Sequence, residues 1–409
     1  MADRLRVGIV GGSISGCAAA AELLGAGHEV TVFERSPGML VSRGAGIVTQ
    51  VEVLEGLIAR GLLNDDFPKL GPKAMRYLCK DGRQSEGRWL GEGTRVAYSL
   101  NWAQLFEQLR RRVPDSVYRG AVGVVGLDVV ESGAVVRTVD GTSETFDLVV
   151  AADGYQSLGR PLVAPDTPLA YRGMVLWRGL VKEGPEETLM LSEHGNTRIV
   201  YSGGHGVVYL IPGPEGETAP GARLANWGYY LQVPTPELDL LLVDDRGQAQ
   251  TGSIPFGRVP ATVTRRFRAR LADAIPPYFL DLIDRTDNTA VQAIYSAQVA
   301  SYVRGRVCLV GDAGSVLPPF TGSGVMKAMA NATSLADALT PSSSPDEGLS
   351  AWSAQQVTTA SQLLPMAESL ERELVFEVPD LVSMSASEIT GWLSTLRPGS
   401  QVTPSSSSS

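Results

Sequence analysis

The first part of the sequence alternates between apolar runs and a segment with helical spacing. Residues 5–10 form a short apolar run, residues 14–26 are rich in alanine, and residues 29–33 form a second apolar run. A strand, a helix and a strand within about 30 residues are typical of a βαβ unit. The pattern therefore predicts an α/β domain that starts near residue 5.

The same mixture of patterns continues to about residue 151. Apolar side chains three and four residues apart predict helices, because these positions share one helix face. Runs rich in valine that are bounded by turn residues predict strands. The helices are predicted over 50–60 and 101–112, and the strands over 121–130, 134–139 and 145–151.

The pattern changes between residues 171 and 260, where short aromatic and β-branched runs alternate with glycine and proline turns. Such runs favour strands, and their close spacing favours an antiparallel sheet. Helical spacing returns afterwards, and Pro365 is expected to kink or break the last helical region. Predicted strands cover 174–181, 197–202, 207–212, 224–232 and 307–310, and predicted helices cover 266–274, 278–285, 325–339 and 347–373.

These patterns predict a fold of the α/β class: a Rossmann-like domain that is interrupted by an inserted antiparallel β-sheet domain and followed by C-terminal helices. The predicted Rossmann-like domain is discontinuous and comprises residues 1–70, 97–167 and 285–397. The predicted sheet domain comprises residues 71–96 and 168–284. Residues 398–409 end in a serine run and are expected to be a disordered tail.

Composition narrows the class of protein. The chain has 409 residues, 44% hydrophobic and 19% charged, with a formal net charge of −9. This acidic balance argues against nucleic acid as a partner, because phosphates attract basic surfaces. Three cysteines without a CxxC pair predict no zinc site and suit a reducing cytoplasm. Without a signal peptide or a run of about 20 apolar residues, we expect a cytoplasmic monomer or homodimer without membrane contact.

The turn after the first strand resembles a phosphate-binding fingerprint. It has glycine at the first and last positions, Gly11 and Gly16, with Ser13 in place of the usual middle glycine. A helix that starts here offers backbone N–H groups and a positive dipole end to a pyrophosphate. Glu34 ends the second strand, 18 residues after Gly16, where a carboxylate accepts hydrogen bonds from a ribose. This motif alone fits either NAD or FAD.

Two later segments favour FAD over NAD. The sequence DGYQSLGR follows a predicted strand at residues 153–160, and GDA follows another at 311–313, with GSG at 322–324. A domain that binds only NAD needs neither segment. Carboxylates at strand ends can hold the longer ribityl chain of FAD, and a glycine-rich helix start can face the flavin edge.

Together the three motifs resemble those of the class A, single-component flavoprotein monooxygenases, in order and over nearly the full chain. The segments at 10–16, 34–37, 46–48 and 177–179 further resemble members that oxygenate a dihydroxypyridine, which also carry the Ser13 substitution and a lysine like Lys327. This resemblance implies that the residues expected to bind FAD are Gly11, Ser13, Ile14, Ser15, Gly16, Glu34, Arg35, Arg43, Gly44, Asp153, Gly154, Arg160, Gly311, Asp312, Gly322, Gly324 and Val325.

The resemblance also implies an activity. NADH or NADPH would reduce the flavin as a transient partner, and dioxygen would then form a flavin C4a-hydroperoxide that inserts one oxygen atom into an electron-rich aromatic or N-heteroaromatic ring. One alternative keeps the FAD but performs an epoxidation, a dearomatisation or a Baeyer–Villiger oxidation of a natural-product intermediate. A more distant alternative is an FAD dehydrogenase or reductase that oxygenates nothing.

Candidate substrate contacts come from the predicted sheet and from the segment after residue 44. Gln50 is expected to face the substrate, and the catalytic candidates Tyr201, Tyr209 and Tyr229 lie on predicted strands. A tyrosine can hydrogen-bond to a phenol, although aromatic side chains on strands more often belong to the core. Arg178 either binds an acidic substrate or pairs with a surface acid, and the sequence leaves both possibilities open.

Overall fold

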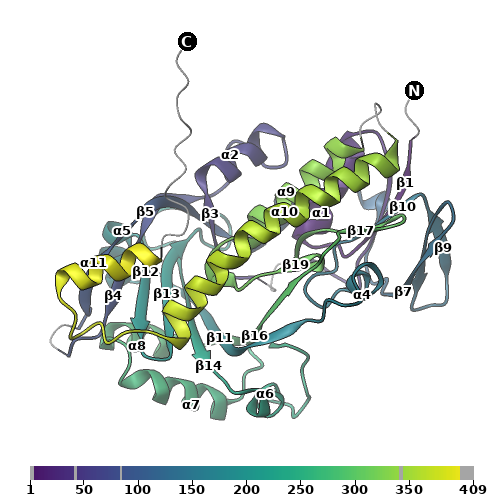
Figure 1. Ribbon diagram of the computed structural model, residues 1–409. Coiled ribbons are helices and arrows are strands. Elements are labelled where there is room, and N and C mark those ends of the chain that lie inside the picture. The colour runs from purple at the N-terminus through teal and green to yellow at the C-terminus, as the bar shows by residue number, and fades with distance from the viewer. Residues whose placement is uncertain (1–3, 41–43, 83–84, 340–343, 397–409) are drawn as a thin grey trace.

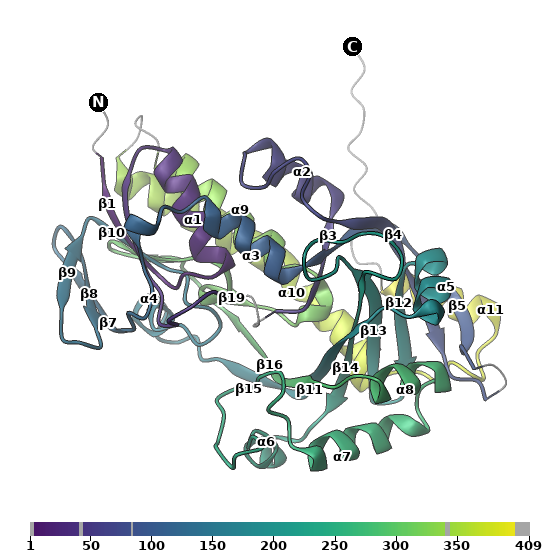
Figure 2. The same ribbon diagram turned by 180° about the vertical axis from the view of Figure 1, so that it is seen from behind.

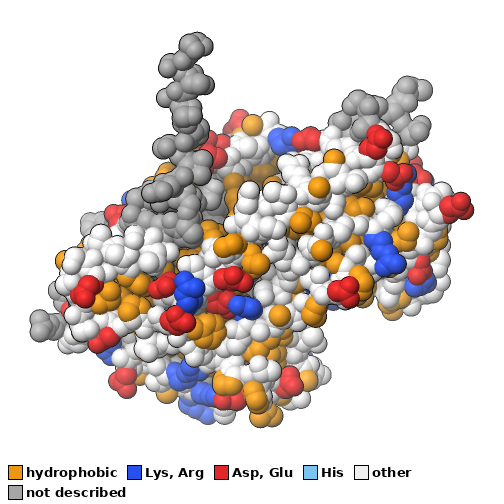
Figure 3. All heavy atoms as spheres, viewed as in Figure 1, with side chains coloured by type: hydrophobic (Ala, Val, Ile, Leu, Met, Phe, Trp, Pro, Cys, Tyr) orange, Lys and Arg blue, Asp and Glu red, His pale blue; other side chains and the backbone are white. Residues whose placement is uncertain are grey.

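A computed structural model describes residues 4–40, 44–82, 85–339 and 344–396 of the chain. The expectations for Arg43 and for the tail at 398–409 lie outside these residues. The chain forms a parallel-sheet half and a larger-sheet half, which lie side by side in Figure 1. No helix among the described residues is long and apolar enough to cross a membrane. On the face shown in Figure 3, acidic and basic side chains are interspersed.

The first half is built on a six-stranded sheet whose central strands are parallel. Its order is β17-β18-β10-β1-β2-β6, and only β17 runs antiparallel to its neighbour. The central strands are apolar and almost wholly buried, as expected for a parallel sheet covered on both faces. The strands are β1 (Arg6–Val10), β2 (Glu29–Phe33), β6 (Tyr118–Arg119), β10 (Leu148–Ala151), β17 (Val303–Arg304) and β18 (Val307–Leu309).

Helices cover one face of this sheet and a small antiparallel sheet covers the other (Figure 2). The small sheet packs through Phe146, whose ring lies against Gly8 of β1 and edge-on to Phe33. The helices are α1 (Ile14–Gly25), α3 (Trp102–Arg111) and α9 (Gly324–Ala338), and the small sheet consists of β7 (Val124–Val130), β8 (Gly133–Thr138) and β9 (Ser143–Phe146). The short α4 (Gly159–Val163) lies on the same face as the small sheet, next to β7.

The prediction of a single strand over 145–151 is wrong. The segment forms two strands, β9 and β10, which belong to different sheets. The break falls at Asp147, whose carboxylate accepts a hydrogen bond of 2.6 Å from the backbone N–H of Arg6. This side-chain contact ends one ladder and starts the next, and a strand pattern alone does not show it.

The second half is built on a ten-stranded sheet with the order β15-β16-β11-β14-β13-β12-β4-β5-β3, and β19 pairs with β16. All its ladders are antiparallel except β12–β4, which is parallel. It also includes β3 and β16, which our expectation placed in the other domain. The strands are β3 (Gly46–Gln50), β4 (Leu70–Cys79), β5 (Arg88–Asn101), β11 (Ala170–Lys182), β12 (Asn196–Tyr201), β13 (Gly204–Ile211), β14 (Leu224–Gln232), β15 (Ser253–Ile254), β16 (Thr289–Gln298) and β19 (Ser315–Val316).

One face of the larger sheet forms an aromatic core. Trp177 and Trp227 are fully buried and meet edge to face, with ring centroids 5.1 Å apart, and Phe267 packs against them. Helices α7 and α8 lie along this side of the sheet (Figure 2). The helices of this half are α5 (Pro185–His194), α6 (Thr235–Leu241), α7 (Ala261–Ala272), α8 (Pro277–Asp284) and α11 (Ala386–Thr395). Helix α2 (Val51–Ala59) follows β3, but its buried Leu54 and Leu57 pack into the core of the parallel half.

A long helix, α10 (Pro345–Glu371), crosses from one half of the molecule to the other (Figure 1). Trp352 packs into the core of the parallel half, whereas Leu370 packs into a core of the larger-sheet half. Pro365 lies inside this helix without ending it. The helix therefore connects the two halves through packed side chains at both of its ends.

Candidate active site

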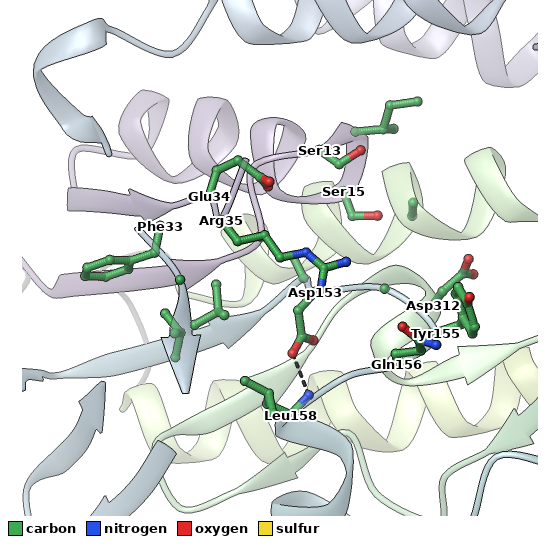
Figure 4. A pocket seen from close by; sticks show the side chains of 18 of the residues that line it. Ser13, Ser15, Phe33, Glu34, Arg35, Asp153, Tyr155, Gln156, Leu158 and Asp312 are labelled. Atoms are coloured by element: carbon green, nitrogen blue, oxygen red, sulfur yellow. Dashed lines mark hydrogen bonds between the residues drawn. The ribbon is translucent and has the colours of Figure 1, made fainter. Parts of the chain in front are cut away.

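The three sequence motifs meet at one edge of the parallel sheet. Strands β18, β10 and β1 are direct neighbours, and the motifs follow their carboxyl ends. Ligands of open α/β sheets bind at this edge. Here a cavity of about 460 Å³ lies between the motifs, and Ser13, Glu34, Asp153 and Asp312 line it (Figure 4).

The first motif needs its glycines for two different reasons. Gly11 has a φ of +98°, and a Cβ atom there would lie 2.5 Å from the carbonyl oxygen of Ala152. A Cβ atom at Gly16 would lie 1.8 Å from the carbonyl oxygen of Gly11, so Gly16 lets α1 pack on the strand. Ser13 is the N-cap of α1 and lines the cavity, as do Ile14 and Ser15. The backbone N–H groups of the first turn of α1 therefore face the cavity.

Glu34 lies just beyond β2 and is almost fully buried, with 4% of its surface exposed. Its carboxylate accepts hydrogen bonds of 2.9 Å from the backbone N–H groups of Gly12 and Ser36. These bonds fix the carboxylate at the cavity wall next to Arg35, which also lines the cavity. Each carboxylate oxygen keeps lone pairs for a further donor.

Asp153 follows β10 and has one oxygen without a partner. Its Oδ2 atom accepts a hydrogen bond of 2.6 Å from the Leu158 backbone N–H (Figure 4), whereas its buried Oδ1 atom has none among the described residues. Burial raises the pKa of this carboxyl group, although the hydrogen bonds from Ser157 and Leu158 oppose the shift. An acceptor left open at a cavity wall fits a ligand hydroxyl.

Asp312 lies on the short turn after β18. Its carboxylate, 48% exposed, forms an ion pair of 2.9 Å with Lys327, which is 4% exposed and also donates to the Ser315 carbonyl oxygen. The side-chain oxygen of Asn331 accepts a hydrogen bond of 2.9 Å from the backbone N–H of Gly311. Two side chains of α9 thus hold the turn that presents Asp312 to the cavity.

The other expected FAD-binding residues occupy several places. Gly154, Gly324 and Val325 line the cavity, whereas Gly16 and Gly311 shape its walls from behind. Arg160 is buried and donates to the carbonyl oxygens of Tyr155 and Asp312, so it holds the two loops together instead of lining the cavity. Gly44 packs against Trp102, and Gly322 lines a different cavity.

That second cavity, of about 340 Å³, lies between the larger sheet and the segment before α9. Its floor is formed by β11, β12, β13 and β14, and its other walls are formed by residues 45–48 and 319–322. Gly324 and Val325 line both cavities. The N-terminus of α9 is therefore the place where the two cavities meet.

Strand register decides which of the predicted tyrosines can reach the second cavity. Tyr209 lines it, whereas Tyr201 and Tyr229 belong to the aromatic core on the opposite face of the sheet. Successive side chains of a strand point to opposite faces, which separates Tyr229 from its neighbour Tyr230, a lining residue. This placement removes Tyr201 and Tyr229 from the substrate-contacting candidates. Gln50 is exposed and lines neither cavity, so it is removed as well.

Sequence reasoning missed several residues of the two cavities. Arg198 and Asn226 line the second cavity, and Trp102 lines the first. Asn226 also accepts the Gly46 backbone N–H at 2.8 Å, which ties β14 to the cavity wall. Only the strand register, which aligns Arg198 with Val207 and Gly228, could have indicated the position of Arg198.

The fold and site define a dinucleotide-binding α/β protein with an adjoining cavity for a small molecule. Two family models match: one described as FAD binding domain-like over residues 171–296, and one described as NAD(P)-binding Rossmann-like domain over residues 9–43. The chain is 30% identical to 2,6-dihydroxypyridine 3-monooxygenase of Paenarthrobacter nicotinovorans, covering 90% of this chain and 91% of that one. It is 26% identical to salicylate hydroxylase of Pseudomonas putida, covering 81% and 76% of the two chains.

A solved structure gives the same assignment. The 2,6-dihydroxypyridine-3-hydroxylase of Arthrobacter nicotinovorans superimposes with a TM-score of 0.83 at 28% identity, covering 93% of this chain and 96% of that one. The chain therefore belongs to the FAD-dependent monooxygenase family and is an oxidoreductase with FAD as its cofactor. The expected family, fold class and cofactor are confirmed.

Proposed function

We propose that the enzyme inserts one atom of dioxygen into an electron-rich aromatic or N-heteroaromatic ring, with NADH or NADPH as the reductant. In the overall reaction, the ring C–H becomes C–OH, the second oxygen atom leaves as water, and NAD(P)H is oxidised to NAD(P)⁺ with uptake of one proton. The relatives named above are hydroxylases of small aromatic rings, which supports this class of substrate.

The observation that carries the proposal is the shared wall at Gly324 and Val325. A dinucleotide held in the first cavity would reach the second cavity past this helix start. The positive end of α9 there would stabilise negative charge on a reduced ring system. The second cavity is lined mostly by apolar and aromatic side chains, which suit the flat ring of an aromatic substrate.

The first cavity fits FAD by its donors and acceptors. The N-terminus of α1 would bind the pyrophosphate, Glu34 the ribose hydroxyls, and the open Oδ1 of Asp153 together with Asp312 the ribityl chain. When bound, FAD supplies the two-electron redox chemistry and the activation of dioxygen. The chain itself positions the ring of the substrate and supplies the charges around it.

At the substrate, Tyr209 would donate a hydrogen bond. Burial raises the pKa of its phenol, with Arg178 opposing the shift, so the hydroxyl stays protonated at neutral pH. A protonated phenol donates to an oxygen on the substrate ring and so favours the electron-rich form that an electrophile attacks.

The test uses the purified holoenzyme. We expect extracted cofactor to be FAD, and NADH or NADPH oxidation to accelerate when phenols, pyridinols or quinolones are added. Under ¹⁸O₂, the product should gain one labelled oxygen atom. Oxygenation only of an isolated alkene, amine or thiol, with every phenol inert, would contradict the proposed substrate class. Oxidation of NAD(P)H without any oxygenated product would instead indicate a dehydrogenase or reductase.

A further inference from the structure

A buried lysine lies behind the wall that the two cavities share. Lys327 belongs to α9 and follows Gly324, which lines both cavities, by three residues. Residues three apart in a helix are neighbours on one side of it. The next residue, Ala328, lines the first cavity as well. Lys327 therefore stands about one helical turn behind the place where the two cavities meet.

The ammonium group of Lys327 connects both ends of the turn after β18. It forms an ion pair of 2.9 Å with the carboxylate of Asp312, near the start of this turn, and it donates to the carbonyl oxygen of Ser315 at its end. The Lys327 side chain is only 4% exposed, so water and salt screen its charge weakly. The lysine therefore places a positive charge directly behind the Asp312 carboxylate.

Asp312 differs from the other two carboxylates of the first cavity. Glu34, Asp153 and Asp312 all line it (Figure 4), but among the described residues only Asp312 forms an ion pair. Glu34 and Asp153 accept hydrogen bonds from backbone N–H groups instead. The carboxylate that is paired with a cation is therefore the one that contacts α9, where the two cavities meet.

A second buried side chain of α9 holds the same turn. The side-chain oxygen of Asn331 accepts the N–H of Gly311, and its amide nitrogen donates to the side-chain oxygen of Gln356 on α10 at 2.7 Å. Asn331 is 2% exposed, so this contact lies inside the protein. The ion pair of Asp312 and Lys327 is thus held in place from two sides. Charges fixed in this way need no reorganisation when charge develops on a ligand.

The position of Asp312 creates an electrostatic conflict that the lysine resolves. FAD that has accepted two electrons and one proton carries one more negative charge than oxidised FAD. A carboxylate beside the cofactor repels this added charge, whereas an ammonium group attracts it. Lys327 bonds only to Oδ1 of Asp312, so among the described contacts the second carboxylate oxygen stays available to a ligand hydroxyl. With its partner, Asp312 can bind the cofactor without opposing its reduction.

We propose that Lys327 raises the reduction potential of the bound FAD by compensating the charge of Asp312. Charged groups near a flavin are among the means by which a protein sets its potential. Lys327 is a positioning residue in this role, because it lines neither cavity and acts through Asp312. The role depends on the FAD alone and is independent of the proposed aromatic substrate.

The test measures the midpoint potential of the FAD in the purified holoenzyme, by stepwise reduction in equilibrium with a dye of known potential. Lys327→Met leaves the charge of Asp312 uncompensated, so we expect reduced FAD to be disfavoured about tenfold relative to oxidised FAD, which lowers the potential of a two-electron couple by about 30 mV. Asp312→Asn removes the opposite charge and should raise the potential. The double variant carries neither charge and should lie between the two single variants.

Two further variants separate the charge of the lysine from its packing. Lys327→Arg keeps the positive charge and should restore most of the potential that Lys327→Met loses. Lys80→Met is the matched control, because Lys80 also donates to a backbone carbonyl oxygen, that of Ala272, but lines neither cavity. Its potential should equal that of the parent. For a variant that does not retain FAD, the dissociation constants of added oxidised and reduced FAD give the same ratio through a thermodynamic cycle.

Equal midpoint potentials in Lys327→Met and the parent would overturn the proposal, because a lysine that only holds the turn would weaken the binding of oxidised and reduced FAD alike. An equal loss in Lys80→Met would overturn it as well, since the effect would then not belong to this site. If Lys327→Met does not fold, Asp312→Asn decides, and an unchanged potential there has the same meaning. These measurements need neither NAD(P)H nor a substrate, so a failure of the proposed oxygenation is detected separately.

Discussion

The walls of the two cavities of this protein are formed by different kinds of chemical group: mainly backbone turns in the first and mainly side chains in the second. The first is formed by turns at the carboxyl ends of parallel strands, where glycines and backbone N–H groups shape the wall and carboxylates are fixed by backbone hydrogen bonds. The second is formed by side chains on the face of a mainly antiparallel sheet. The first therefore depends on local chain geometry, whereas the second depends on the register of four strands. A substitution should accordingly act on backbone shape in one cavity and on side-chain chemistry in the other.

The largest effect is expected from the backbone of the first cavity. Gly16→Ala should lower the free energy of unfolding by about 3 kcal/mol and abolish FAD retention, because the new Cβ atom meets the carbonyl oxygen of Gly11. Gly25→Ala, in the same helix, is the control, since a Cβ atom there meets nothing within 4 Å. Thermal unfolding and FAD content measure both variants. Equal midpoints for the two would contradict the packing role of Gly16.

A smaller effect is expected from a carboxylate of the same cavity. Glu34→Ala should raise the dissociation constant of FAD about tenfold to a hundredfold, because the ribose and two backbone N–H groups lose their acceptor. Glu29→Ala, on the exposed side of the same strand, should leave it unchanged. Fluorescence titration of the apoprotein with FAD measures both. Equal affinities would show that Glu34 does not contact the cofactor.

The stability of the protein should depend on pH through a histidine of the larger-sheet half. His205 is fully buried and stacks on Tyr230, and burial, aided by the charge of Arg198, holds its pKa well below the usual value. The unfolded chain then binds the extra proton, so stability is lost as the pH falls below about 6.5.

In the His205→Phe variant, the loss of stability that His205 causes at low pH should disappear. Below pH 6.5 the parent should lose up to about 1.4 kcal/mol per pH unit more than the variant, as for one proton. Unfolding of both proteins between pH 7.5 and 5 measures the difference in slope. Parallel curves would mean that His205 takes up its proton in the folded protein at the same pH as in the unfolded chain, which contradicts the lowered pKa.

The smallest effect separates the two faces of the larger sheet. Tyr209→Phe should lower kcat/KM for an aromatic substrate about tenfold, because one hydrogen bond to the ring is lost. Tyr229→Phe should leave kcat/KM unchanged and leave stability equal or slightly higher, since the buried Tyr229 hydroxyl has no partner among the described residues. Steady-state kinetics and thermal unfolding distinguish the faces, and a kinetic loss confined to Tyr229→Phe would reverse the assignment.

The sequence predicted the first cavity well because its determinants are local. The strand, the glycine turn, the helix and Glu34 follow one another within residues 6–34, and each position has a backbone reason. The pattern at residues 145–151 was misleading, because two strands of different sheets meet at Asp147, which accepts a hydrogen bond from Arg6, a residue distant in sequence. Contacts of that kind cannot be derived from a pattern of apolar residues.

The second cavity was predicted poorly for a related reason. The strand at 224–232 is buried on both faces, so no alternation of apolar and polar residues shows which side faces the cavity. Tyr229 and Tyr230 therefore looked equivalent, and the choice of Tyr229 was incorrect. Arg198 was overlooked because its place on the cavity face follows only from its alignment with Arg178 across two intervening strands.

The helix start at Gly324 and Val325 has a consequence for how this enzyme can diversify. A larger side chain at either position would reduce the volume of both cavities at once, so we expect few changes there to be compatible with function. The strands β11, β12, β13 and β14 line the second cavity alone. A library of variants selected for a new substrate should therefore accumulate its successful changes on the floor of the sheet, whereas α9 should remain as it is.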